Sequence, residues 1–237
     1  LAIQRGAAAS EVSPGDVVTY TLQVQVSDFF AYGDVVIDDD LSDGQRFDTG
    51  FTPTLDGLPM SPANFTETID SPGSGRTALQ FRVSDEIGPV LGGCIPPGGT
   101  GGPAPDCGTT NNGPTTLTLV YRAVVQDEFS DTFPSGDESV DHGDTLDNAV
   151  SITGDVLSPA NLVPTGSTEN DNSGSNLVVA FGDIAKSIYA IDGSTALPTP
   201  LEVEPGQVVT FRLRYTLPSS DFDTLELTDF LPLPVFL

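Results

Sequence analysis

The chain contains two copies of one sequence segment, and this duplication constrains its fold more than any other feature. Val12–Leu22 reads VSPGDVVTYTL, and Val203–Leu213 reads VEPGQVVTFRL, 191 residues later. A second match follows in the same order, because Ile37–Leu41 (IDDDL) returns as Leu227–Leu231 (LTDFL), 190 residues later. The interval is far longer than a solenoid repeat, so we expect each copy to be a domain with its own core.

The duplication predicts two domains in tandem. Residues 1–182 are expected to form the first domain, and residues 183–237 the N-terminal part of a second, similar one. The second copy is too short to complete a sandwich. We therefore expect either a sequence cut from a longer tandem protein or a last domain completed by another chain. The sequence begins at Leu1 without a basic n-region or a cleavage signal.

The hydrophobic pattern predicts an all-β fold. From Val18 to Val26, apolar residues alternate with Thr and Gln, which is typical of a strand with one face on a core. The second copy repeats this pattern from Val209 to Tyr215. Other expected strands are Val35–Ile37, Ala78–Val83, Thr116–Val125, Leu146–Ile152, Leu177–Phe181 and Ile184–Ile191. No segment has a helical stripe with caps. An immunoglobulin-like antiparallel β-sandwich fits this pattern best, in tandem copies with the second incomplete.

The charge balance excludes several classes of partner. There are 34 acidic residues against 8 basic ones, giving a formal net charge of −26. Such a surface repels phosphate backbones and anionic membranes, so neither nucleic acid nor a lipid surface is an expected partner. No apolar run approaches the roughly 18 residues that a membrane-spanning helix needs.

Four motifs, in order, resemble the conserved immunoglobulin-like repeat domain found in tandem in bacterial and archaeal cell-surface proteins, such as adhesins and surface fibres. They are Pro14–Leu22, Ile37–Leu41, Thr145–Gly154 (TLDNAVSITG) and Ile184–Ile188 (IAKSI). The resemblance covers the first domain apart from its insertions, and the start of the second. It implies an extracellular scaffold or adhesive role at the cell surface, without general enzymatic activity, and names no ligand.

Lys186 is the only lysine of the chain and shares strand parity with apolar neighbours. The resemblance implies one use for it, because similar tandem domains join a first-strand lysine to a last-strand Asn or Asp in an isopeptide bond. Asn148 lies in the last-strand motif of the first domain, but that domain has Gln4 or Arg5 where the lysine would be. An exposed or ion-paired Lys186 is the favoured alternative, because lysines are seldom fully buried.

Cys94 and Cys107 bracket a Gly/Pro-rich segment. We predict a disulfide between them, which implies an oxidising compartment. In the loop-closure model such a link stabilises the fold by about 3 kcal/mol. Zinc is the rival, but two thiols and a distant histidine do not have the usual ligand spacing.

Acidic clusters at strand ends are candidate calcium sites, because Ca²⁺ prefers oxygen-rich loops. The candidate ligands are Asp38, Asp39, Asp40, Asp43 and Asp183. The glycine after them is one position late for an EF-hand, and no Glu closes the loop. With so many carboxylates, a solvated acidic face is the favoured interpretation of any one cluster. Asp39 and Asp229 occupy the same place in the two copies, which indicates a structural role such as capping a turn backbone.

No catalytic constellation is evident. His142 is the only histidine and lies in a turn-like DHGD context, and the chain has no Gly-x-Ser-x-Gly elbow, phosphate loop or His-rich metal signature. We predict that the chain is not an enzyme and holds no cofactor, calcium being the one candidate.

The leading hypothesis is a non-catalytic structural repeat of an extracellular adhesin, stalk or surface filament, whose partners are further repeats or neighbouring copies of itself. Strand exchange between subunits is one form of such assembly. The alternative is a glycan- or protein-binding module on the long insertions Leu41–Gly75 and Ile87–Gly113, where Phe47, Phe51 and Phe65 would provide aromatic contacts.

Overall fold

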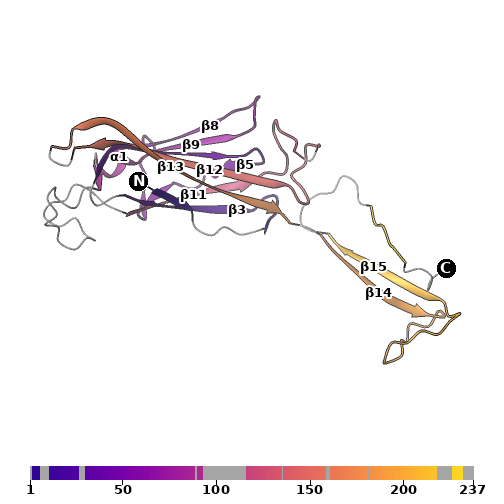
Figure 1. Ribbon diagram of the computed structural model, residues 1–237. Helices are drawn as coiled ribbons and strands as arrows, with labels where there is room; N and C mark the ends of the chain where they lie inside the picture. Colours follow the sequence, from indigo (N-terminus) through magenta and orange to yellow (C-terminus); the bar gives the residue numbers. More distant parts are fainter. Residues whose placement is uncertain are drawn as a thin grey trace.

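The protein forms a two-layer β-sandwich and a separate two-stranded sheet, as seen in a computed structural model of the chain (Figure 1). The structure describes residues 2–5, 11–26, 30–88, 90–92, 116–134, 136–158, 161–180, 182–217 and 226–231. Within these residues, no helix is both long enough and apolar enough to cross a membrane.

The first layer of the sandwich has six strands around the predicted Val18–Val26 segment. Its strands are β1 (Ala2–Arg5), β3 (Val17–Gln25), β5 (Gln45–Phe47), β6 (Thr54–Leu55), β7 (Leu58–Pro59) and β11 (Thr116–Val125). Their order is β1-β3-β11-β6-β7, and β5 also pairs with β11. The central pair, β3 and β11, is antiparallel along its whole length.

The second layer has seven strands. They are β2 (Glu11–Val12), β4 (Ala31–Leu41), β8 (Phe65–Ile69), β9 (Thr77–Arg82), β10 (Leu91–Gly92), β12 (Thr145–Leu157) and β13 (Pro164–Val179). Their order is β2-β13-β12-β4-β9-β8, and β10 also pairs with β4. One short helix, α1 (Val83–Ile87), follows β9, where the sequence pattern predicts none.

The opening segment of the chain contributes one strand to each layer. β1 pairs antiparallel with β3 in the first layer, whereas β2 pairs in parallel with β13 in the second. The following strands then divide between the layers, β3 and β11 in one and β4, β12 and β13 in the other. This is the strand arrangement of an immunoglobulin-like sandwich, so the predicted sandwich fold is confirmed, whereas the predicted tandem copies stay a prediction.

The core lies between the two layers. The predicted inward face of β3 is confirmed, because Tyr20, Leu22 and Val24 are all buried while the residues between them are exposed or half-buried. Ile37 of β4 and Ile152 of β12 meet them from the other layer. Alternation of side chains along each strand therefore closes one continuous apolar interior.

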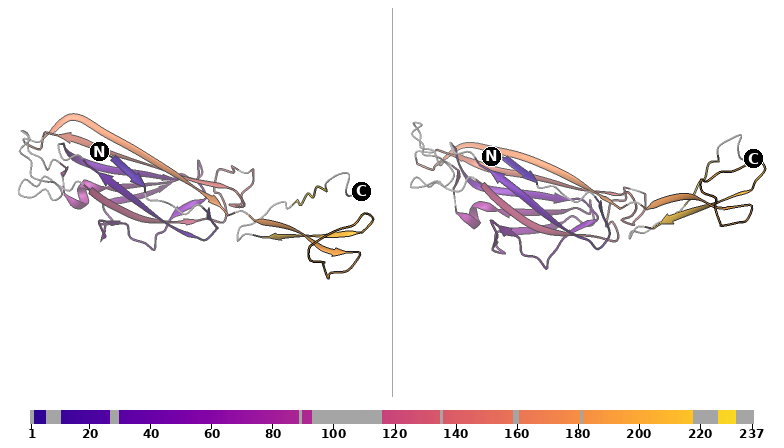
Figure 2. Two further views of the ribbon diagram at one scale, coloured as in Figure 1. Left: turned by 60° about the horizontal axis from the view of Figure 1, so that its bottom comes forward. Right: turned by 90° about the horizontal axis from the view of Figure 1, so that it is seen from below.

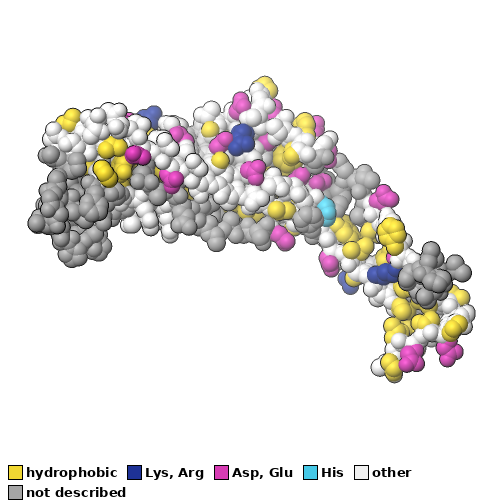
Figure 3. Space-filling model, viewed as in Figure 1, with side chains coloured by type: hydrophobic (Ala, Val, Ile, Leu, Met, Phe, Trp, Pro, Cys, Tyr) yellow, Lys and Arg dark blue, Asp and Glu magenta, His cyan; other side chains and the backbone are white. Residues whose placement is uncertain are grey.

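The remaining two strands, β14 (Asp183–Ile191) and β15 (Val209–Thr216), pair only with each other among the residues that the structure describes. They are antiparallel and extend away from one end of the sandwich in all three ribbon views (Figures 1 and 2). Large hydrophobic side chains are exposed in this part, among them Ile184 and Val208, and they are conspicuous on the face drawn in Figure 3. The part therefore presents apolar surface that the sandwich does not cover.

Candidate functional site

A carboxylate lies inside the sandwich because of strand alternation. Along β4, Ile37, Asp39 and Leu41 share the core-facing side, and Asp38 and Asp40 point to the opposite side. Only 1% of Asp39 is exposed to solvent. A buried carboxylate is costly unless it is hydrogen-bonded, so its partners are the first clue to what this site does.

Tyr121 of β11 reaches across the core to this carboxylate. Its hydroxyl donates to Asp39 Oδ2 at 2.6 Å and accepts a hydrogen bond from Asn148 Nδ2 at 2.7 Å. Burial of the ring, and then the neighbouring Asp39 charge and hydrogen bond, raise the pKa of Tyr121 well above its ordinary value. The hydroxyl therefore stays protonated and keeps donating to Asp39.

A second tyrosine extends this connection. The Tyr20 ring stacks on the Tyr121 ring with 5.1 Å between centroids, and its hydroxyl donates to Gln45 Oε1 at 2.5 Å. Gln45 is fully buried and donates in turn to the backbone carbonyl of Asp147 at 3.0 Å. Both tyrosines thus link the first layer to groups of β12 or β4 in the second.

We refer to Tyr20, Asp39, Gln45, Tyr121 and Asn148 as the inter-sheet polar cluster. All five are at most 2% exposed, so the cluster is enclosed in the core. Its hydrogen bonds have direction, unlike the apolar contacts around it, and they fix how the two layers lie on each other. The arrangement suits resistance to sliding of the layers.

Asp43, just after β4, holds a neighbouring loop. Its carboxylate accepts backbone N–H groups from Ser130, Asp131 and Thr132 at 2.8–3.0 Å, and from Gly44 at 2.9 Å. Burial raises the pKa of this carboxyl, but the four amides outweigh burial and bring it below the ordinary value. Asp43 therefore acts as an ionised anchor for the loop that follows β11.

The five predicted calcium ligands lie in different environments. Asp39 faces the core and Asp43 the loop amides, whereas Asp40 is paired with the Arg76 guanidinium at 2.7 Å on the outer face. Asp38 accepts from Gln80, and Asp183 begins β14 in the other part of the molecule. Across the described ranges, no three His, Cys, Asp or Glu side chains group as a metal site. Calcium binding stays a prediction.

The structural role predicted for Asp39 takes another form than the turn cap given as its example. Asp39 binds a tyrosine hydroxyl across the core, and turn backbone groups are instead capped by Asp43. Tyr121 and Gln45 are not among the site residues that the sequence predicts. One sequence feature does point to Tyr121: in the predicted Thr116–Val125 strand it falls at a position whose side chain faces the core.

Lys186 lies on the apolar side of the two-stranded sheet. Its Nζ is 2.5 Å from Asp229 Oδ1 and 4.5 Å from the centre of the Phe211 ring. The lysine is opposite Leu213, and Arg5 is opposite Leu22 in the β1–β3 pair. Lys186 is thus ion-paired with the residue that corresponds in sequence to Asp39. An isopeptide bond at Lys186 stays a prediction.

The two cysteines and the histidine remain to be placed. Cys94 and Cys107 lie outside the described residues, so the disulfide stays a prediction. His142 Nδ1 accepts the N–H of Gly182 at 3.2 Å, at the junction between β13 and β14.

The three aromatic residues of the first insertion contribute to packing. Phe47 is buried in the core, and Phe65 is 5.6 Å from it between ring centroids. The Arg122 guanidinium lies 4.4 Å above the Phe51 ring. These rings are therefore engaged within the protein, although the alternative hypothesis uses them for ligand contact.

Fold and site together define an immunoglobulin-like β-sandwich whose layers are joined by a buried polar cluster. No family model matches the chain, and no curated protein matches it. Among solved structures it is similar to domains D2 and D3 of the major pilin SpaD from Corynebacterium diphtheriae, with 10% identity and a TM-score of 0.41. That match covers 82% of this chain and 57% of the other.

Two further similar structures differ in what they do. One is BcpA, the major pilin subunit of Bacillus cereus, with 12% identity, a TM-score of 0.40, and 91% of this chain and 55% of that one covered. The other is AvmM, which catalyses macrocyclization in alchivemycin A biosynthesis, with 10% identity, a TM-score of 0.37, and coverage of 75% and 87%. The chain spans a little over half of the two pilin structures. These likenesses do not assign a function.

Proposed function

We propose that this chain is a non-catalytic structural repeat of an extracellular adhesin, stalk or surface filament. Residues 1–182 would be one module and residues 183–237 part of the next, joined head to tail. The module would carry tension between its neighbours, and further repeats or neighbouring copies of the protein would be its partners.

The observation that carries this proposal is a repeated strand register. β1 pairs with β3 so that Arg5 is opposite Leu22, and β14 pairs with β15 so that Lys186 is opposite Leu213. Leu22 and Leu213 are equivalent residues of the duplicated segment, 191 positions apart. The second part thus starts with the same strand pairing as the first, which supports a tandem array of one module.

The geometry of the sandwich suits a tension-bearing role. Val12 of β2 and Val179 of β13 are neighbours in a parallel pair, and Ala180 N–H donates to the Val12 carbonyl at 2.8 Å. Pulling on the two ends of a module moves β2 and β13 in opposite directions along their length. The hydrogen bonds between these two strands are therefore sheared at the same time, and they resist the force jointly. The inter-sheet polar cluster adds directional bonds between the layers, which opposes their separation.

The apolar side of the β14–β15 sheet supports assembly with further strands. Ile184, Ile188, Phe211 and Tyr215 lie on this side, and Ile184 is 53% exposed. A two-stranded sheet alone is marginally stable in water and needs more strands or a packing partner. We expect this side to be covered by strands of the same module type, from the same protein or, through strand exchange, from a neighbouring copy.

Single-molecule pulling on the full chain tests the tension-bearing role. Under reducing conditions we expect one cooperative unfolding event for the sandwich. Residues 12–179, extended at about 3.3–3.6 Å each, give a contour gain on the order of 550 Å after the folded length is subtracted. Ala180→Pro removes the N–H that bonds to Val12, so the mean rupture force should fall while the contour gain stays the same.

Glu202→Pro is the control, because Glu202 lies in an exposed segment outside the strands. Its sandwich should rupture at the wild-type force. Gradual extension without a distinct rupture peak would contradict the proposed role. Equal rupture forces in the Ala180→Pro and wild-type proteins would contradict loading through the β2–β13 pair.

A further inference from the structure

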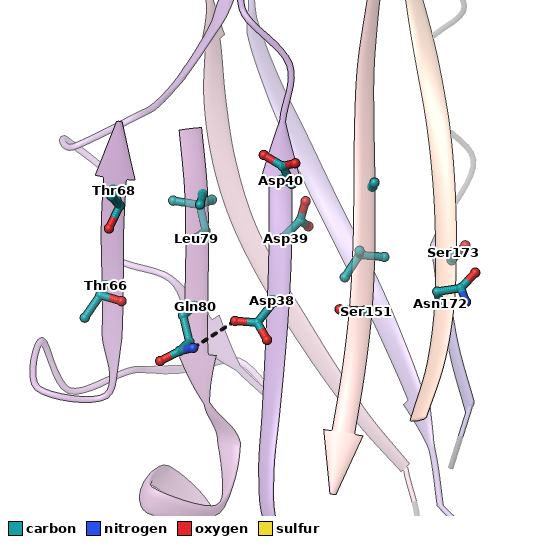
Figure 4. A pocket seen from close by; sticks show the side chains of 13 residues that line it. Asp38, Asp39, Asp40, Thr66, Thr68, Leu79, Gln80, Ser151, Asn172 and Ser173 are labelled. Carbon is teal, nitrogen blue, oxygen red and sulfur yellow. Dashed lines mark hydrogen bonds between the residues drawn. The ribbon is translucent and has the colours of Figure 1, made fainter. Parts of the chain in front are cut away.

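The outer face of the second layer carries a hollow that the structural role does not use. It crosses five neighbouring strands, β13, β12, β4, β9 and β8, and has a volume of about 650 Å³ (Figure 4). Adjacent strands are about 4.8 Å apart, so five strands span about 19 Å. The hollow is therefore wide enough for an extended ligand that lies across the strands.

Small side chains create the hollow. Ala78 of β9 and Ala149 of β12 are exposed on the outer face, one on each side of β4, and neither extends far from the sheet. Longer polar side chains border them, with Thr66 and Thr68 on β8 and Asn172 on β13. The depression thus follows from the sequence of outward-facing positions, and it has a polar rim.

The hydrogen-bonding groups around the hollow are of mixed type. Asp38 receives a hydrogen bond from Gln80 Nε2 on one carboxylate oxygen, Oδ1, at 2.9 Å. Its Oδ2 accepts none within the described part of the chain. Asn172 offers an amide, and Ser151 and Thr66 offer hydroxyls, so both donors and acceptors are present across the strands. This combination matches a ligand with many hydroxyl groups, each of which both donates and accepts.

Charge narrows the class of ligand. Two arginines lie on the outer face beside the lining strands: Arg76 is paired with Asp40 at 2.7 Å, and Arg82 is exposed two residues beyond Gln80 on β9. The chain as a whole has a formal net charge of −26. The net charge of the chain disfavours phosphorylated, sulfated or uronic-acid ligands, whereas neutral hydroxyl groups can bond to the carboxylate of Asp38 through charge-assisted hydrogen bonds.

We propose that this hollow binds a neutral oligosaccharide, with Asp38, Gln80 and Asn172 as the main recognition groups. The site lies on the strands and not on the long insertions. None of the described residues that line it is aromatic, so recognition depends on hydrogen bonds to hydroxyl groups. The dissociation constant should accordingly lie in about the millimolar range. The proposal does not depend on the tension-bearing role.

Titration of the full, isotope-labelled chain with neutral hexasaccharides tests the site by amide chemical shifts. Cellohexaose, maltohexaose and β-1,4-linked mannohexaose are the probes, at up to about 10 mM, well above a millimolar dissociation constant. We expect saturable shifts for Gln80, Ser151 and Asn172 with at least one probe. A hexamer of galacturonic acid, matched in size but anionic, should produce none.

Matched variants locate the binding. Ala149→Trp fills the hollow and should weaken binding about tenfold or more. Thr153→Trp, on the outward side of the same strand but outside the lining, should bind like the wild type. Asp38→Asn keeps the shape of the side chain and should weaken binding about threefold to tenfold, because a charge-assisted bond becomes a neutral one.

Three results would overturn the proposal. They are no saturable shift with any of the three neutral probes, equal binding by the Ala149→Trp and wild-type proteins, and stronger binding of the anionic hexamer. Thermal unfolding of each variant is measured alongside. If Ala149→Trp does not fold, Asp38→Asn decides the matter, and wild-type affinity in that variant rejects the site.

Discussion

Asp39 differs from its two aspartate neighbours because successive side chains of a strand point to opposite faces of the sheet. The run Asp38–Asp40 consists of three aspartates, but only Asp39 faces the core, where the Tyr121 hydroxyl donates a hydrogen bond to it. Its neighbours on either side contact Gln80 and Arg76 on the outer face. A run of three aspartates is therefore divided between an internal hydrogen-bond cluster and an outer surface that can meet a ligand.

Replacing Tyr121 with Phe should destabilise the sandwich by about 2 kcal/mol. The variant keeps the ring in the core but removes the hydroxyl that donates to Asp39 and accepts from Asn148, and bonds to buried polar groups are costly to lose. Denaturant unfolding followed by circular dichroism gives the free energy of unfolding.

Tyr189→Phe is the matched control, because this tyrosine is 42% exposed on the two-stranded sheet. It should change the free energy of unfolding by less than about 0.5 kcal/mol. If Tyr121→Phe were as stable as Tyr189→Phe, the inter-sheet polar cluster would not hold the layers together.

At the scale of elements, Asp43 connects the end of β4 to the loop that follows β11. The link is formed by backbone amides, and any residue type except proline can supply them, so nothing in the sequence of residues 130–132 reveals it. Gly75 lies directly against the same carboxylate, at a position where a Cβ atom would collide with it and where φ is +68°. Three separate segments thus meet at one anionic side chain.

The Asp43 anchor predicts a pH dependence of stability. Because the folded pKa of Asp43 lies below its ordinary value of 3.8, its contribution is fully present above that value and is lost as the pH falls through the folded pKa. Asp43→Asn should cost about 2 kcal/mol at neutral pH. The free-energy gap between wild type and variant should narrow progressively below pH 3.8.

The difference in free energy of unfolding between wild type and Asp43→Asn reports on Asp43 alone, because all other carboxyls are present in both proteins. Denaturant unfolding at several pH values between neutral and strongly acidic gives the gap directly. Asp127→Asn, an exposed position in the same loop region, is the control and should unfold with nearly the wild-type free energy at neutral pH. A gap for Asp43→Asn that grew in acid would mean that the carboxylate is not the stabilising form.

Strands with a regular apolar period could be predicted from the sequence, and strands without one could not. The predicted Thr116–Val125 strand has the bounds of β11. In contrast, β13 begins at Pro164, although the sequence indicated only its last residues. Most of its side chains from 164 to 176 are exposed, because backbone pairing with β12 holds this strand without burying them. A strand held only by backbone pairing shows no alternation of apolar and polar residues in its sequence.

At the scale of the whole molecule, charge is the dominant property. A formal net charge of −26 on 237 residues favours expanded states through self-repulsion. Raising NaCl from about 0.01 M to about 1 M shortens the screening length from about 30 Å to about 3 Å. We expect the melting temperature to rise by a few degrees, which corresponds to about 1 kcal/mol for a chain of this size.

KCl at the same ionic strength should give the same rise, because screening does not depend on the cation. A falling melting temperature would contradict the electrostatic explanation. A larger rise with CaCl₂ at equal ionic strength would indicate that the predicted calcium site exists in addition to screening.

The parallel pairing of β2 with β13 has a consequence for how a newly made chain folds. Residues 11 and 12 find their partners only at residues 178 and 179, so the sandwich cannot close until β13 has left the ribosome. At about 5–20 residues per second, β2 waits about ten to thirty seconds for its neighbour. During synthesis its edge and the apolar side of β3 stay open to other nascent chains or chaperones, so this interval is when the protein is most exposed to misassembly.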